Sequence, residues 1–353
     1  MIKLPGLIDP HVHLREPGAT YKEDWDSGTK AGLAGGFTML LAMPNTDPPI
    51  TSEKTLKLSE KSARDKARLD YGQFLGAGPD NAEALALLAP RAAGLKLYLD
   101  QTYGPLRLDD MTIWQDHFIH WPGIVPIAVH AEGRSLAAVL LMSLFYDKPV
   151  HICHIARREE ILLIRAAKEN GVKVTCEVTP HHLFMTKNDI PQDSPGKGEV
   201  RPRLATSQDR DALWDNLDVI DCFATDHAPH TLTEKESAEP LPGFPGLETA
   251  LFLFLTAVKE GRLSLEDIVF RMSDNPRKIY RLPDQFDTWI EIDPDPAWEI
   301  RAQDTYTRCG WTPFEGWQVH GRLRHVSLRG EIVFQDGEVI AEPGSGRNVR
   351  IEV

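Results

Sequence analysis

The sequence is poor in the features of secreted and membrane-spanning proteins. It has only four cysteines in 353 residues and no CxxC pair, a pattern that favours reduced thiols over a disulfide framework. It lacks any run of about 18 apolar residues, so no transmembrane helix is expected. The first fourteen residues include proline, glycine, aspartate and two histidines, which the apolar core of a signal peptide would not carry. We therefore expect a cytoplasmic protein.

Positive charge is also scarce. The chain has 39 Lys and Arg against 52 Asp and Glu, a formal net charge of −13. This balance argues against nucleic acid or an acidic membrane surface as a partner. An anionic substrate would need positive charge placed locally, as metal ions or a few arginines. The composition, 42% hydrophobic and 26% charged, is typical of a soluble globular enzyme.

Short apolar segments recur along the first two thirds of the chain, each ending in polar residues. Most are continuous rather than alternating, as expected for strands buried on both faces, and helical stretches such as 53–67 and 159–170 fall between them. The alternation predicts an α/β fold, and eight strands favour a closed (β/α)₈ TIM barrel over an open doubly wound sheet. The eight expected strands are 4–13, 37–45, 69–77, 94–100, 125–132, 150–156, 173–179 and 220–228.

The C-terminal part differs from the barrel pattern. We predict a barrel domain over residues 1–282 and a small β subdomain over 283–353 that packs on it. Residues 283–318 are rich in Pro, Trp and Asp and are expected to be irregular, whereas 322–339 reads as two strands joined at Asp336-Gly337. Such a hairpin is only marginally stable alone. It must therefore pack on the barrel, and Trp311, Phe314 and Trp317 are the candidate contacts.

Ionisable residues gather at the carboxyl ends of the expected strands, where the function of such barrels collects. Several different strands each contribute one at the same height, a pattern that indicates a metal site. These residues are His11, His13, Lys96, His130, His154, Glu177 and Asp226. His11 and His13 lie two residues apart, so their side chains point to the same side of one strand. Neutral imidazole is a common zinc ligand, and Asp226 can complete the set.

Lys96 lies in the apolar strand 94–99. Burial favours its neutral amine, which can react with CO₂ to give a carbamate, an anionic ligand able to bridge two metals. Alternatively, Lys96 extends to the barrel mouth or pairs directly with a carboxylate.

Cys153 and Glu177 admit two interpretations. Together with His11 they can hold a further zinc ion. Alternatively, Cys153 is a small core residue, and Glu177 does not bind a metal itself but hydrogen-bonds to a residue that does. Adjacent strand residues face opposite ways, which favours the core interpretation for Cys153 unless the strand end bends.

Several motifs resemble signatures of the dihydroorotase branch of the amidohydrolase superfamily. The resemblance covers essentially the whole chain and is closest to the dihydroorotase domains of animal-type multifunctional pyrimidine-synthesis proteins. The motifs are DPHVHLREPG at 9–18, MPNT at 43–46, the lysine strand 94–100, HAE at 130–132, HICH at 151–154, ATDHAPH at 224–230 and PGFPGLE at 242–248.

The resemblance implies a site built around two Zn²⁺ ions. Whether a third ion binds depends on the role of Cys153 and Glu177. One metal would be held by His11, His13 and Asp226, and the second by His130 and His154. Carboxylated Lys96 and a hydroxide would bridge them. The implied substrate-binding residues are Arg15 and Asn45 for a carboxylate, with Arg201, His230 and the backbone near Pro242 lining the rest of the pocket.

The implied activity is the reversible interconversion of N-carbamoyl-L-aspartate and L-dihydroorotate in de novo pyrimidine synthesis. Two cations activate a water and polarise the carbonyl, while Asp226 moves a proton from that water to the ring nitrogen. A hydantoinase, dihydropyrimidinase or allantoinase is the alternative. A substrate without the ring carboxylate would leave a buried Arg15 unpaired, which is costly. A non-catalytic scaffold is the second alternative, but such a protein would lack the histidines and the lysine.

Two further expectations concern the loops and the ends of the chain. Thr102 and Tyr103, in the loop after the lysine strand, are candidates for a lid that covers the substrate; an ordinary βα loop is the alternative.

The first strand begins almost at the first residue, whereas relatives usually carry an N-terminal β segment that pairs with C-terminal strands. We expect that segment to be missing, the chain to be fused to other pyrimidine-synthesis domains, and the domain to form a homodimer.

Overall fold

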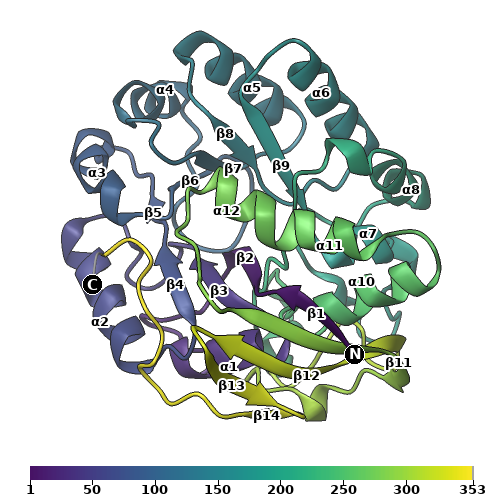
Figure 1. Ribbon diagram of the computed structural model, residues 1–353. Coiled ribbons are helices and arrows are strands. Elements are labelled where there is room, and N and C mark those ends of the chain that lie inside the picture. Colours follow the sequence, from purple (N-terminus) through teal and green to yellow (C-terminus); the bar gives the residue numbers. More distant parts are fainter. Residues whose placement is uncertain (352–353) are drawn as a thin grey trace.

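The computed structural model describes residues 1–351, and it contains all eight predicted barrel strands (Figure 1). The strands are parallel and almost entirely buried, as their apolar composition requires. Each is shorter than predicted, and the third is interrupted at Phe74. The barrel strands are β2 (Leu7–Val12), β3 (Phe37–Ala42), β4 (Asp70–Gln73) continued by β5 (Leu75–Gly76), β6 (Leu95–Tyr98), β7 (Ile127–His130), β8 (Val150–Ile152), β9 (Val174–Val178) and β10 (Cys222–Phe223).

The barrel closes between its first and last strands. Val12 forms a parallel bridge with His227, and the backbone N–H of His13 donates to the His227 carbonyl at 2.7 Å. The buried carboxylate of Asp9 accepts hydrogen bonds from the backbone N–H of Thr225 at 3.2 Å and from its hydroxyl at 2.5 Å. The predicted TIM barrel is therefore confirmed, and its seam lies beside the metal-ligand candidates.

Helices surround the barrel, as Figure 1 shows. The predicted helix over 53–67 is α2, which begins at a capping box formed by Ser52 and Thr55 and buries Leu56 and Ala63 on one face. The helices are α1 (Trp25–Ala34), α2 (Glu53–Lys66), α3 (Ala82–Leu88), α4 (Met111–His120), α5 (Arg134–Tyr146), α6 (Arg158–Glu169), α7 (Pro180–Phe184), α8 (Ser207–Asp215), α9 (Leu232–Lys235), α10 (Ala250–Lys259), α11 (Leu265–Val269) and α12 (Asn275–Ile279). Among residues 1–351, no helix is long and apolar enough to cross a membrane.

A second, antiparallel sheet of five strands packs beside the barrel. The expectation that 283–318 is irregular is wrong for Trp289–Glu299, because these residues form the long strand β11. Its prolines, Pro294 and Pro296, fall where the pairing register shifts between Asp293 and Ala297, so they remove no regular ladder bond. In sheet order the strands are β1 (Ile2–Pro5), β11 (Trp289–Glu299), β12 (Gln318–Leu328), β13 (Glu331–Gln335) and β14 (Glu338–Val339).

Two further predictions about this sheet are corrected by its pairing. Residues 322–339 form three strands rather than two, because a second turn at Arg329-Gly330 joins β12 to β13. The N-terminal β segment is not missing: β1 pairs antiparallel with β11 from Ile2 to Pro5. The subdomain therefore includes residues outside 283–353. Four residues separated from β2 by Gly6 are too few to show their own alternation, which is why the sequence merges them with the first barrel strand.

The predicted aromatic contacts fix residues 311–317 to the barrel. Trp311 and Phe314 are buried, and the indole N–H of Trp311 donates to the carbonyl of His230 at 2.7 Å. The appended sheet touches α10 through Gly321, whose φ is +91°; a Cβ there would lie 2.6 Å from Leu255. The appendage thus supports a loop that carries a candidate site residue.

Candidate metal centre

The structure brings all seven predicted ionisable residues together at the carboxyl ends of the barrel strands. His11, Lys96, His130 and Glu177 lie on β2, β6, β7 and β9. His13 directly follows β2, and His154 and Asp226 lie in the turns just beyond the ends of β8 and β10. None is more than 8% exposed. His154 and Asp226 have positive φ angles of 37° and 46°, a region that non-glycine residues seldom occupy. The strand ends turn sharply at these two positions, which aims both side chains into the barrel.

His11, His13 and Asp226 form one possible ligand group. Their donor atoms all lie within 4.8 Å of one another. Oδ1 of Asp226 is 3.3 Å from Nε2 of His11 and 3.1 Å from Nε2 of His13. Two imidazole nitrogens and a carboxylate oxygen that converge in this way match the donor set that zinc prefers.

His130 and His154 form a second pair. Nδ1 of His130 lies 3.0 Å from Nε2 of His154, although the residues come from different strands. The remaining ring nitrogens, Nε2 of His130 and Nδ1 of His154, are buried without a hydrogen-bond partner. The two facing nitrogens, Nδ1 of His130 and Nε2 of His154, lie close enough for one cation to bind both, so the residues fit the metal that the resemblance implies.

Lys96 is near both groups, because its charge lowers the pKa of His11 in the first and of His130 in the second. Its side chain is fully buried, so the alternative in which it extends to the barrel mouth is wrong. The Nζ atom donates to Sγ of Cys153 at 2.8 Å. Among residues 1–351 no carboxylate lies within ion-pair distance of Nζ, so a direct pair with a carboxylate is not formed either. An isolated buried ammonium is expensive, which favours an amine that has been made anionic.

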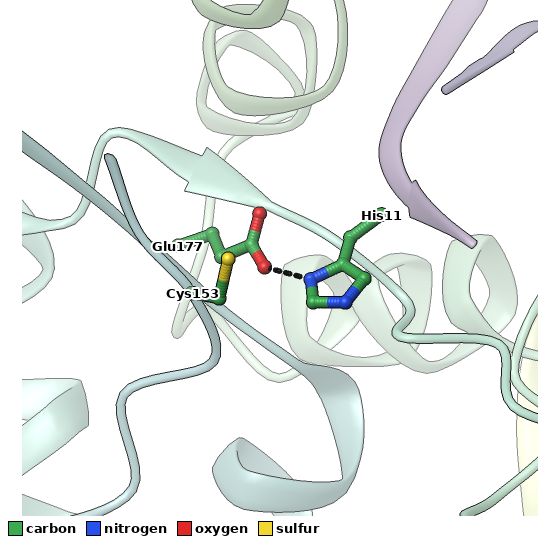
Figure 2. Close-up of side chains that lie close together, drawn as sticks. All are labelled: His11, Cys153 and Glu177. Carbon is green, nitrogen blue, oxygen red and sulfur yellow. Dashed lines mark hydrogen bonds and ion pairs between the residues drawn. The ribbon is translucent and has the colours of Figure 1, made fainter. Parts of the chain in front are cut away.

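A third group of possible ligands, drawn in Figure 2, includes Nδ1 of His11 rather than its Nε2. The donor atoms of His11, Cys153 and Glu177 lie within 4.8 Å of one another. Oε1 of Glu177 is 2.5 Å from Nδ1 of His11, and its Oε2 is 3.0 Å from Nε2 of His151. Cys153 follows the last residue of β8 and faces inward, since its Sγ accepts from Lys96, and the chain bends directly after it at His154, whose φ is 37°. The bend required for a third site is therefore present.

The electrostatics of the site favour neutral imidazoles beside ionised carboxylates. Burial lowers the pKa of His13 to about 4, although Asp226 opposes this. Burial also lowers the pKa of His154. Burial raises the pKa of Asp226, but His11 and His13 outweigh it and hold that pKa well below its usual range. Neutral imidazoles and carboxylates are the ionisation states that bind a cation.

His11 is the exception among the histidines. Burial and Lys96 lower its pKa, but Glu177 and Asp226 outweigh both and raise it to about 10. A proton therefore occupies His11 between two carboxylates when no metal is bound. A cation with two positive charges would replace that proton in the same anionic environment.

A cavity above these residues is lined by four of the five predicted substrate-binding residues; the fifth, His230, is fully buried and does not line it. Its lining includes Arg15, Asn45, Thr102, Tyr103, Arg201, Asp226, Pro242 and Gly243. Arg15 is buried and donates from Nε to the Pro229 carbonyl at 3.0 Å. Asn45 lies 2.6 Å from Nδ1 of His13, so its amide joins the metal-ligand candidates to the substrate side. Arg201 pairs with Glu199 at 2.7 Å.

The loop that carries Thr102 and Tyr103 lies over this cavity. The Tyr103 ring packs edge-on against the ring of His230 at a centroid distance of 4.9 Å, and the Arg15 guanidinium lies 5.2 Å from its centroid. Asn45 donates to the Tyr103 carbonyl at 3.1 Å. The loop is therefore held by residues of the cavity itself.

Sequence analysis misses three buried polar residues that support the site. Asp9 joins the strands at the barrel seam, and burial raises its pKa to about 7. His151 holds the second oxygen of Glu177. Lys22 contacts His230. Asp9 and His151 stand inside the quoted motifs, which is a usable signal, whereas Lys22 lies in a polar stretch that looks like solvent-exposed loop.

Comparisons with known proteins agree with this geometry. Residues 1–101 match the family described as dihydro-orotase-like. The chain is 55% identical over 350 residues to the multifunctional protein CAD of Squalus acanthias, a match that covers 99% of this chain and 16% of that protein. It is 40% identical over 362 residues to a dihydroorotase of Pyrococcus furiosus, covering 98% of this chain and 85% of the relative.

Solved structures show the same architecture. The inactive dihydroorotase-like domain of the Chaetomium thermophilum CAD-like multifunctional protein matches with a TM-score of 0.85 at 29% identity, covering 98% of both chains. L-Hydantoinase from Arthrobacter aurescens matches with a TM-score of 0.94 at 24% identity, covering 99% of this chain and 88% of that one.

The closed barrel and its buried histidines, lysine and aspartate define an amidohydrolase-type barrel. Within that class, the chain belongs to the dihydroorotase family. It spans only 16% of the length of the multifunctional relatives that it matches at 55% identity.

Proposed function

We propose that this chain is a dihydroorotase that interconverts N-carbamoyl-L-aspartate and L-dihydroorotate in the cytoplasm. The observation that carries the proposal is the buried guanidinium of Arg15, which faces the cavity beside the metal-ligand candidates. Its planar fork matches a carboxylate. A cyclic-amide hydrolase whose substrate carries no carboxylate would leave this cation hydrogen-bonded to the Pro229 carbonyl but without an anionic partner.

His11, His13 and Asp226 would hold one metal ion, His130 and His154 a second, and carboxylated Lys96 would bridge them. When bound, two zinc ions would supply a strong nucleophile near neutral pH and polarise the amide carbonyl. The carboxylate of Asp226 lies on the cavity wall, and His11 and His13 hold its pKa well below the usual range. It can accept a proton from the attacking water and return it to the ring nitrogen as the C–N bond breaks.

The carbamate on Lys96 forms when its neutral amine adds to CO₂ and releases one proton. Two facts support this step: the side chain is fully buried, and no carboxylate pairs with it among residues 1–351. A third zinc ion between His11, Cys153 and Glu177 is proposed on the convergence of their donor atoms. Its removal would leave the substrate cavity intact, since Cys153 and Glu177 do not line it.

Arg15 and Asn45 would bind the ring carboxylate, with Arg201, His230 and the backbone near Pro242 around the rest of the pocket. Thr102 and Tyr103 would act as a lid that excludes water from the cavity. A hydantoinase-type activity is the main alternative, but at 24% identity the likeness to L-hydantoinase concerns the fold alone.

We also propose that the natural protein is multifunctional, because relatives such as CAD of Squalus acanthias and pyr1-3 of Dictyostelium discoideum match over about one sixth of their length. We expect the domain to be a homodimer. Helix α5 supports this expectation, because Leu141, Leu144 and Phe145 form an apolar stripe on it and Phe145 is 76% exposed. A strictly monomeric mass at tens of micromolar would exclude the dimer.

Metal analysis combined with an activity assay tests the proposed function. We expect the purified chain to contain at least two zinc ions per molecule and to turn over both N-carbamoyl-L-aspartate and L-dihydroorotate. A metal-loaded, folded protein that converts neither compound would overturn the proposal.

A further inference from the structure

Lys22 is a buried lysine that is neither a metal-ligand candidate nor part of the cavity lining. It lies in the loop between β2 and α1, and its side chain is 1% exposed. Nζ lies 2.8 Å from Oε1 of Glu234 and 3.1 Å from Nδ1 of His230. Glu234 is itself held, because it accepts from the Tyr21 hydroxyl at 2.9 Å and from the backbone N–H of Thr231 at 2.9 Å. The ammonium group is thus held by Glu234 next to Nδ1 of the His230 ring.

The contacts of His230 determine where its ring proton lies. An ion-paired ammonium group can only donate, so Nδ1 of His230 must accept from Lys22. On the opposite side, Nε2 lies 3.0 Å from the carbonyl oxygen of Pro242, which can only accept. Nε2 must therefore carry the hydrogen, and both contacts require the same tautomer. Burial lowers the pKa of His230, and Arg15 and Lys22 lower it further, so the ring is neutral.

With the hydrogen on Nε2, the close contact between Arg15 and His230 is not a hydrogen bond. Nη2 of Arg15 lies 3.1 Å from Nε2 of His230. Both nitrogens carry hydrogens, so neither can accept from the other. The Pro242 carbonyl already accepts from the His230 N–H, so a carboxylate oxygen placed beside Arg15 would share it with that carbonyl while also accepting from the guanidinium. In the opposite tautomer, Arg15 would donate into the ring and one donor would be lost.

We propose that Lys22 is a positioning residue that fixes His230 as an Nε2–H donor, so that Arg15 and His230 together bind the substrate carboxylate. This inference rests on the proposed function, because that function supplies the carboxylate. Lys22 does not touch the substrate; it acts through the tautomer of His230. An arginine at position 22 could also donate to Nδ1, whereas a methionine has similar length and no hydrogen to donate.

The first test reads the tautomer directly and requires no activity. Nitrogen NMR of histidine rings in the metal-loaded protein distinguishes protonated from unprotonated ring nitrogens. We expect the His230 ring, assigned by its loss in His230→Asn, to carry its hydrogen on Nε2 in the wild type and in Lys22→Arg. In Lys22→Met we expect a shift toward the Nδ1–H form. An unchanged Nε2–H tautomer in Lys22→Met would overturn the proposal.

The second test measures whether the effect of Lys22 on substrate binding depends on His230. We expect Lys22→Met to raise KM for L-dihydroorotate roughly 10- to 100-fold, the range for one hydrogen bond to a charged group, with a smaller change in kcat. In the His230→Asn background the same substitution should change KM by less than about 2-fold, because the residue through which it acts is gone.

Arg271→Met is a matched control that removes another buried cation. The Arg271 guanidinium binds the carbonyls of Ile220 and Leu217 away from the cavity, so its loss should lower stability and leave KM unchanged. An equal KM effect of Lys22→Met in both backgrounds would overturn the proposal. If the wild type showed no turnover at all, the proposed function would fail. The NMR test would still decide whether Lys22 sets the tautomer of His230.

Discussion

Nδ1 of His11 lies 2.5 Å from Oε1 of Glu177, and both side chains are buried. In the metal-free protein this contact joins an imidazolium to a carboxylate, because Glu177 and Asp226 raise the pKa of His11 to about 10 against burial and Lys96. A raised folded-state pKa contributes stability that is fully present below the unfolded value near 6.5 and lost as the pH rises toward 10.

The metal-free protein should therefore lose thermal stability between about pH 7 and pH 10. Melting curves of chelator-treated protein across this range measure the effect. His11→Asn should flatten the decline, because it removes the titrating group. A metal-free Tm that stays constant or increases over the same range would show that His11 is not protonated in the folded state.

Lys96→Ala should abolish activity and reduce the zinc content below two per molecule. The substitution removes the bridging anion, so two cations would face each other with less negative charge between them. Zinc content by mass spectrometry and turnover of L-dihydroorotate measure both effects. Lys66→Ala, which removes a partly exposed lysine paired with Glu16, is the control. Wild-type turnover with both metals retained in Lys96→Ala would rule out the carbamate.

Asp226→Asn should reduce kcat by about 10²- to 10⁴-fold, the usual worth of a positioned proton acceptor. The amide occupies the same space but cannot take the proton. Circular dichroism should show an intact fold, because the strand and helix hydrogen bonds do not involve this side chain. A decrease of less than about 10-fold would assign the proton transfer to another residue.

Substitution of both Thr102 and Tyr103 by alanine should raise KM and lower kcat together. The Tyr103 ring contacts His230 and lies near Arg15, so its loss opens the cavity to water. Tyr103→Phe keeps the ring and is the matched control, expected to retain most activity. If the double variant kept both kinetic constants, this loop would be an ordinary connection.

The barrel and the convergence of ionisable residues could be predicted from sequence because both depend on strong local signals. Continuous apolar runs mark strands buried on both faces, and a histidine or aspartate that ends such a strand has only one edge of the barrel to occupy. The inward position of Cys153 could not be predicted, since it depends on a bend at His154 that strand alternation does not reveal.

The appended sheet was harder to predict for a different reason. β1 pairs with β11 across nearly the whole chain, and β11 carries two prolines that argue against a strand when its register is unknown. Lys22 shows the same limit at the site: its burial depends on Glu234 and His230, more than 200 residues away in sequence.

The central claim is that this metal-dependent barrel acts on a cyclic amide that carries a carboxylate. The most direct test compares kcat/KM of the zinc-loaded chain for L-dihydroorotate and for dihydrouracil, which is the same ring without the carboxylate. The account predicts that L-dihydroorotate is preferred by about 10⁴-fold or more, because a site built to bind a charged group rejects the analogue that lacks it. Equal or faster opening of dihydrouracil would contradict the account.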